Sequence, residues 1–146
     1  MASLKEFLKE KKYKVFDLQQ IHTNHLKIKM KLNGVDGDFI VDTGASNTCI
    51  GLGGIQKFEL NTEVSDVKAA GAGATEMETH KAIKIPVKIG RWKTKIDLVV
   101  LDLSHVNIAL KNHLSEEIDG IIGADLLQKG AAVIDYSKNR LYLKKL

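Results

Sequence analysis

Apolar and polar residues alternate along two stretches of the chain, with the period of two that is typical of a β-strand covered on one face. Leucine, isoleucine and methionine alternate with lysine over residues 26–32, and isoleucine and valine recur at every second position over 83–89. The dipeptides Asn33-Gly34 and Asp36-Gly37 offer tight turns, and the return strand Asp38–Asp42 is apolar at three consecutive positions, 39 to 41. Because a strand that is apolar on both faces belongs in the interior of a fold, the pattern predicts a mostly β chain with a hairpin over residues 26–42.

Two short helices interrupt this pattern. Ser3 and Glu6 have the spacing of a capping box, and the apolar residues that follow share one helical face as far as the lysines at 11 and 12. We expect this N-terminal helix to pack on its own sheet, the alternative being that it docks a partner or a second copy. The second helix is predicted over Ala124–Lys129, ended by Gly130.

Further strands are predicted over Lys95–Leu103 and Ile118–Gly123, and two closing strands flank the turn at residues 137–139. The segment between them and the first hairpin is rich in glycine and other small residues, with Gly71-Ala72-Gly73-Ala74 at its centre. A glycine-rich turn between two strands indicates a mobile hairpin.

Length and composition fit one globular unit. A chain of 146 residues with 44% hydrophobic and 27% charged residues, and no low-complexity run, can bury a single core. We therefore expect one folded domain over residues 25–146, preceded by a helix and a lead-in strand over 1–24. The lone cysteine, Cys49, excludes a disulfide within the chain and is expected in the core.

The net charge of +4 comes from lysines spread along the whole sequence. Lys27, Lys29 and Lys31 would share one face of a strand, but no aromatic residues lie between them for base stacking, so a solvated sheet face is favoured over a nucleic-acid site. No apolar stretch is long enough for a signal peptide or a membrane span, and we expect a cytoplasmic protein with neither a nucleic-acid nor a membrane partner.

The candidate chemistry lies where the buried return strand ends in Asp42-Thr43-Gly44. Such a strand points a carboxylate out of a tight turn, where the glycine leaves room for another backbone and the threonine hydroxyl can hold the loop. An aspartate in this place can be a simple turn residue or an acid and base. His22 and His25, the one close histidine pair, are interpreted as surface residues rather than metal ligands.

Two segments together carry a family resemblance. The run Ile40-Val41-Asp42-Thr43-Gly44-Ala45 resembles the catalytic loop of the retropepsins, and Gly120-Ile121-Ile122-Gly123-Ala124-Asp125-Leu126-Leu127 resembles their second signature. The two occur in the family's order, with the glycine-rich hairpin between them where the family carries a flap over its substrate. The resemblance extends over about residues 26–143 and is nearer to the cellular and bacterial members than to the viral ones, because the chain continues into a further hairpin.

What the resemblance implies is an all-β, closed acid-protease barrel with a flap hairpin, one short C-terminal helix and the short N-terminal helix. The activity implied is that of an aspartic endopeptidase, a hydrolase that needs no cofactor. One Asp-Thr-Gly per chain supplies one carboxylate and the chemistry uses two, so a homodimer is expected to pair Asp42 with its copy. The alternative is a catalytically silent module that binds peptides or dimerises.

Site roles follow from the resemblance position by position. Asp42 would be the acid or base, Thr43 would hydrogen-bond across the dimer axis, and Gly44 would offer its carbonyl to the substrate. The substrate-binding set would comprise Ala45, Ser46 and Asn47 from the loop and Gly71, Ala72 and Gly73 from the flap tip. Apolar substrate pockets are expected from Ile50, Leu52 and Ile83.

One departure from the viral members stands out. They commonly pair an acidic residue at the position of Ser46 with an arginine at the position of Ala124, and this chain has neither. Because a charge that loses its partner is costly when buried, the joint loss indicates an intact site with a different support. Asp125 is expected to act on the helix N-terminus electrostatically rather than on substrate.

Overall fold

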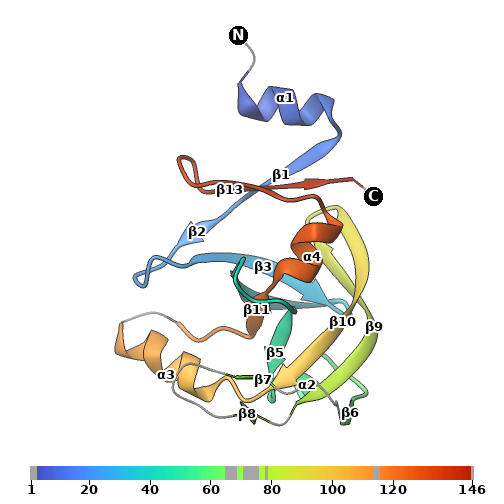
Figure 1. The fold of residues 1–146 in the computed structure, drawn as a ribbon, viewed down its shortest axis with the longest axis vertical. Helices are drawn as coiled ribbons and strands as arrows, with labels where there is room; N and C mark the ends of the chain where they lie inside the picture. The colour runs from blue at the N-terminus through green and yellow to red at the C-terminus, as the bar shows by residue number, and fades with distance from the viewer. Residues whose placement is uncertain (1–2, 65–68, 71–75, 78, 114–115, 146) are drawn as a thin grey trace.

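The computed structural model describes residues 3–64, 69–70, 76–77, 79–113 and 116–145. Three sheets carry its strands: an eight-stranded sheet of order β2-β3-β4-β11-β5-β10-β9-β6, a three-stranded sheet of order β1-β13-β12, and the pair β7–β8 (Figure 1). The strands are β1 (Tyr13–Asp17), β2 (Gln19–Gln20), β3 (Leu26–Leu32), β4 (Val35–Val41), β5 (Cys49–Gly51), β6 (Glu63–Val64), β7 (Ala69–Ala70), β8 (Glu76–Met77), β9 (His80–Ile89), β10 (Trp92–Leu101), β11 (Gly120–Ile122), β12 (Val133–Asp135) and β13 (Arg140–Lys144). The helices are α1 (Leu4–Glu10), α2 (Gly54–Lys57), α3 (Ser104–Asn112) and α4 (Ala124–Lys129).

A closed barrel forms the centre of the molecule. The additional pairing of β3 with β9, at Lys31↔Lys88 and Leu32↔Val87, closes the circuit β3-β4-β11-β5-β10-β9. The predicted hairpin β3–β4 turns at Asn33 and Gly34, whose φ angles of 52° and 83° are those of a tight turn between antiparallel strands. The other candidate turn, Asp36-Gly37, lies inside β4 instead.

Apolar side chains from all six barrel strands fill the interior. Phe39 and Phe58 are both 0% exposed, and their rings lie 6.4 Å apart between centroids. Ile40, the next residue along β4, points the other way and packs with Leu110 and Ile118 beneath α3. The consecutive apolar residues of β4 thus serve two separate clusters, as a strand covered on both faces requires.

The alternation over residues 83–89 is broken by a bulge. Val87 and Ile89 are buried as the pattern predicts, but Ile83 is 48% exposed, and Ala82 is fully buried in its place. The register between β9 and β10 shifts between Ile96 and Leu98, and Lys84 adopts a φ of 53°. An extra residue in one strand reverses the facing of everything before it, which is why a strict period of two failed here.

Helix α3 lies in a stretch for which the sequence analysis predicted no element. Its amphipathic pattern is weak: only Leu110 is buried within it, while Ile108 is 59% exposed. The helix is held by its surroundings, since the side-chain amide of Asn107 accepts from the Ile118 N–H (2.8 Å) and donates to the Ile118 carbonyl (3.3 Å). Tertiary contacts of this kind carry no local sequence signal.

The three-stranded sheet joins the two ends of the described chain. Strand β1 runs antiparallel to β13, from Tyr13↔Lys144 to Asp17↔Arg140, and β12 lies on the far side of β13. Helix α1 precedes β1 and is capped as predicted, with the Ser3 hydroxyl accepting from the Glu6 N–H at 3.2 Å. Figure 1 shows α1, β1 and β13 together at the upper end, beyond the barrel.

Candidate active site

The Asp-Thr-Gly loop leaves β4 at a crossing of three strands. β11 lies between β4 and β5, parallel to the first and antiparallel to the second. In the sequence, 78 residues lie between β4 and β11, and 68 lie between β5 and β11. The Asp42 N–H donates to the carbonyl of Ile122 (2.9 Å), which extends the β4–β11 ladder to the loop itself. The start of the loop is therefore fixed by the barrel.

Within the loop, the Asp42 carboxylate is oriented by the backbone. Its Oδ1 accepts from the Gly44 N–H at 2.8 Å, and its carbonyl accepts from the Ala45 N–H at 3.2 Å. The side chain is half-buried, while Thr43 and Gly44 are exposed. One carboxylate oxygen of Asp42 is therefore held by the loop's own backbone.

The start of α4 supports the loop from behind. The Ala124 N–H donates to the Ala45 carbonyl (2.7 Å), and the Asp125 N–H donates to the Ser46 carbonyl (3.3 Å). A Cβ at Gly123 would meet the carbonyls of Ala45 and Asn47 at 2.8 and 2.7 Å. Only glycine lets the two segments approach this closely.

Asp125 has a role that the sequence analysis did not predict. Its Oδ1 accepts from the Thr48 N–H (2.9 Å), the Thr48 hydroxyl (2.7 Å) and the Leu126 N–H (2.8 Å). Thr48 is fully buried, and its hydroxyl oxygen in turn accepts from the Gly123 N–H at 3.1 Å. Asp125 therefore ties the far end of the loop to α4, as well as lying in the first turn of that helix. The sequence contains a hydroxyl at Thr48 and a carboxylate at Asp125, but only the fold brings these two side chains together.

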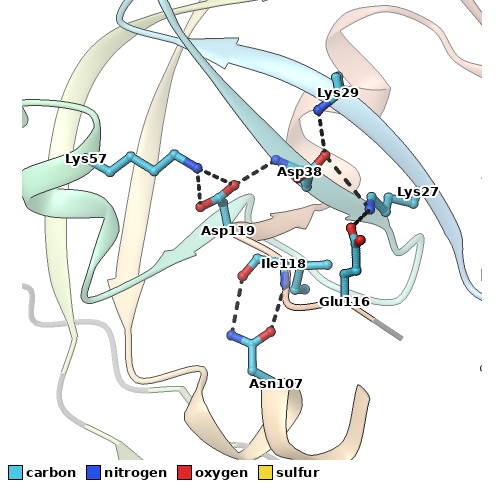
Figure 2. A network of polar contacts seen from close by, with 8 residues as sticks. All are labelled: Lys27, Lys29, Asp38, Lys57, Asn107, Glu116, Ile118 and Asp119. Carbon is cyan, nitrogen blue, oxygen red and sulfur yellow. Dashed lines mark hydrogen bonds and ion pairs between the residues drawn. The ribbon is translucent and has the colours of Figure 1, made fainter. Parts of the chain in front are cut away.

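A second aspartate holds the opposite end of β11. Asp119 accepts from the Asp38 N–H (2.8 Å) and from the Lys57 ammonium at 2.9 Å to each oxygen, and its own N–H donates to the Asp38 carbonyl (2.8 Å). Figure 2 shows the network continuing through Asp38 to Lys29 (3.2 Å) and Lys27 (4.0 Å). This ionic network links β3 and β4 to α2 and to the residue that precedes β11.

The expected site residues fall into two groups. Asp42, Thr43, Gly44, Ala45, Ser46 and Asn47 lie on one loop, with Ser46 and Asn47 exposed and Ala45 half-buried. The expected flap residues Gly71, Ala72 and Gly73 lie outside the described residues, although β7 and β8 on either side pair antiparallel at Ala69↔Met77 and Ala70↔Glu76. The roles assigned to both groups remain predictions.

Three further features bear on the chemistry. Cys49 is buried as expected, and burial raises the pKa of its thiol to about 11, so it is a poor nucleophile. No group of three or more metal-ligating side chains occurs within the described ranges. In the same ranges, no helix is long and apolar enough to cross a membrane.

Comparison with known proteins defines the class. The family model described as "Aspartyl protease" matches residues 28–126, more than half of the 146 residues. This chain belongs to the aspartyl protease family. No curated protein sequence matches it.

Solved structures identify the fold as retropepsin-like. A retropepsin-like aspartic protease from Rickettsia conorii superposes with a TM-score of 0.64 at 20% identity, over 91% of this chain and 92% of its own. The retroviral protease-like domain of Ddi1 from Leishmania major gives 0.58 at 18%, over 84% and 90%. The EIAV protease, solved with the inhibitor HBY-793, gives 0.57 at 17%, over 75% and 90%. The expected fold class is confirmed.

Proposed function

We propose that this protein is an aspartic endopeptidase whose catalytic pair is Asp42 and the Asp42 of a second copy. The observation that carries the proposal is the oriented, half-buried carboxylate of Asp42, on a loop fixed by β11 at one end and by Asp125 at the other. Membership of the aspartyl protease family supports it.

The chemistry requires two carboxylates in different protonation states. One is ionised and takes a proton from the attacking water, and the other is protonated and donates to the scissile carbonyl. Two carboxyl groups in contact cannot both ionise at neutral pH, so they share one proton and titrate as a pair. The water oxygen adds to the carbonyl carbon, and the carbon–nitrogen bond then breaks as the amine takes up a proton.

A surface suited to the second copy lies beside the loop. A hollow of about 410 Å³ next to Thr43 is lined largely by small and apolar side chains from α4 and the segment that follows it, namely Ala124, Leu127, Gln128, Ala131, Ala132 and Ile134. In the described structure, β12 is an edge strand of its sheet, so its outer main-chain groups are available to pair with a strand of the second copy. A two-fold contact through this face would place the two Thr43 residues, and hence the two Asp42 residues, close to the axis.

The substrate would be a peptide in extended conformation. Leu52 and Ile83 are each 48% exposed and offer apolar surface to its side chains. Ile50 is 0% exposed in the core, so the expectation that it lines a pocket is wrong.

A peptide library incubated at about pH 4 to 7 tests the activity. The wild type is expected to cleave members of the library, and Asp42→Asn is expected to lose all cleavage while unfolding at the same denaturant concentration. Asp36→Asn, an exposed aspartate on β4, is the matched control and should cleave normally. Equal cleavage by Asp42→Asn and the wild type would contradict the proposal.

A substitution in the hollow tests the dimer. Ile134→Asp is expected to shift the protein to the monomer in analytical ultracentrifugation and to remove cleavage in parallel. Ile108→Asp, at an exposed apolar residue of α3, should change neither. Full cleavage by a monomeric Ile134→Asp protein would contradict the shared pair.

The alternative function is a catalytically silent module that uses the same cleft to bind peptides. It predicts that the wild type and Asp42→Asn bind a library peptide alike and that neither cleaves it. Binding measured on both proteins with the same peptides separates the two functions.

A further inference from the structure

The outer edge of β1 is unpaired in the described structure. β1 is the first strand of its sheet and bonds on one side to β13. The Leu18 N–H donates to the Asn139 carbonyl, and the Lys145 N–H donates to the Lys12 carbonyl. The even-numbered residues of β1 therefore direct their main-chain N–H and C=O groups toward β13. In an antiparallel ladder the alternate residues then face outward, which leaves the main-chain groups of residues 13, 15 and 17 directed away from the sheet.

A basic hollow borders this edge. It has a volume of about 370 Å³, and four cationic side chains lie around it: Lys5 and Lys9 from α1, Lys14 from β1, and Arg91 from the turn between β9 and β10. Lys5 and Lys9 are one helical turn apart and so share a face of α1. Among the residues described, no carboxylate forms an ion pair with any of the four. Four like charges that form no ion pair favour an anionic occupant.

The basic hollow is also partly apolar. It is lined by Val15, Phe16 and Tyr142, which suit an apolar side chain. Tyr142 is 1% exposed, and its hydroxyl finds no hydrogen-bond partner among the described residues. The basic hollow thus combines four cationic groups with apolar surface.

We propose that the edge of β1 and the basic hollow bind an extended, acidic segment of another protein by strand addition. The outward main-chain groups of β1 would bond to the added strand, as in other complexes formed at a sheet edge. Acidic side chains of the segment would meet the four cations, and an apolar one would enter above Tyr142. The free strand edge favours a peptide over a nucleic acid, because a polynucleotide has no main chain that could extend the sheet.

Fluorescence anisotropy with a labelled peptide of about ten residues, alternating glutamate and valine, tests the binding. The full chain carrying Asp42→Asn is used, so that cleavage cannot remove the probe and a failure of the proposed catalysis leaves the result unaffected. We expect saturable binding that weakens as salt is added, because the charges are at the surface. A peptide alternating lysine and valine is expected not to bind. Equal binding of the two peptides, or none of the acidic one, overturns the proposal.

Two variants locate the site. Lys9→Glu/Arg91→Glu is expected to weaken binding at least about tenfold, and the matched double variant Lys93→Glu/Lys138→Glu, at exposed lysines outside the basic hollow, should bind normally. Val15→Pro removes an outward N–H from an edge strand, where proline is tolerated, and should weaken binding at least about fivefold. If Val15→Pro fails to fold, the charge variants alone decide.

A single-stranded oligothymidylate provides the contrasting arm. If it binds more tightly than the acidic peptide, and loses that binding in Lys9→Glu/Arg91→Glu but not in Val15→Pro, the basic hollow is a polyanion site and strand addition is wrong. Weak oligothymidylate binding that leaves the acidic peptide in place supports the proposal.

Discussion

The two ends of β11 are each held by an aspartate, but in different surroundings. Asp125, beyond the C-terminal end, gathers three short hydrogen bonds from neutral groups around the buried Thr48. Asp119, before the N-terminal end, lies in an ionic network in which its own partner Lys57 has 44% side-chain exposure, Lys29 has 73% and Lys27 has 12%. A carboxylate that accepts from several neutral donors around a buried hydroxyl is hard to replace, whereas water and salt can substitute for exposed ion pairs.

Asp125→Ala should have the largest effect on stability. It leaves the Thr48 N–H and hydroxyl and the Leu126 N–H without their acceptor, and we expect a loss of about 3 kcal/mol. Urea denaturation measures it. Asp125→Asn keeps an oxygen acceptor and should lose less than half as much. A loss from Asp125→Ala no greater than that from Asp119→Ala would remove the distinction between the two ends.

Thr48→Val should have the next largest effect on stability. It keeps the shape of the side chain and removes only the hydroxyl. The Gly123 N–H loses its acceptor and the Asp125 carboxylate loses a donor, and we expect about 2 kcal/mol by the same measurement. Thr94→Val on β10 is the control for exchanging the residue type and should be nearly neutral. If both substitutions cost the same, the hydroxyl of Thr48 does not hold the loop.

Asp119→Asn should cost less, about 1 kcal/mol, because its amide oxygen can still accept from the Asp38 N–H and only the partly exposed pair with Lys57 is lost. The loss should shrink between low salt and about 1 M salt, since salt screens the wild-type pair. The loss from Thr48→Val, which involves no ion pair, should not depend on salt. If the loss from Thr48→Val depended on salt and the loss from Asp119→Asn did not, the ionic contacts would lie at the Asp125 end of β11 and not at the Asp119 end.

The smallest effect should be one of pH. The hydrogen bond and charge of Asp38 raise the pKa of Lys29 above its ordinary value of 10.5. The contact between Lys29 and Asp38 therefore stabilises the folded protein fully below about pH 10.5, and this stabilisation is lost as pH rises through the folded-state pKa of Lys29. The difference in free energy of unfolding between the wild type and Lys29→Gln should shrink over that range, and the difference for Lys138→Gln should not.

The sequence predicted those elements whose signals are local. The cap at Ser3, the turn at Asn33-Gly34 and the helix Ala124–Lys129 each depend on a few neighbouring residues, and the structure has all three. The helix α3 was not predicted because its contacts with Ile118 come from the fold. Ile83 does not share the buried face of Val87 and Ile89, because one bulge, which a period of two cannot reveal, changes the register of β9.

The candidate site divides in the same way. The Asp-Thr-Gly loop could be found from its residues, and the glycine at 123 from the second signature. The contact between Thr48 and Asp125 spans 77 positions. Asp125 was assigned to its helix because sequence proximity was the only evidence available. The structure keeps that placement in the first turn and adds the loop as a second partner.

The insertion of β11 between β4 and β5 has a consequence for how the molecule folds. Asp42 meets its backbone partner Ile122 across 80 positions, and Tyr13 pairs with Lys144 across the terminal sheet. On a ribosome, the Asp-Thr-Gly loop would emerge long before the strand that fixes it. Contacts so distant in sequence form slowly, since much chain entropy is lost before they are made. The Asp-Thr-Gly loop should therefore become ordered late in folding, and a chain that ends before β11 should leave it without support.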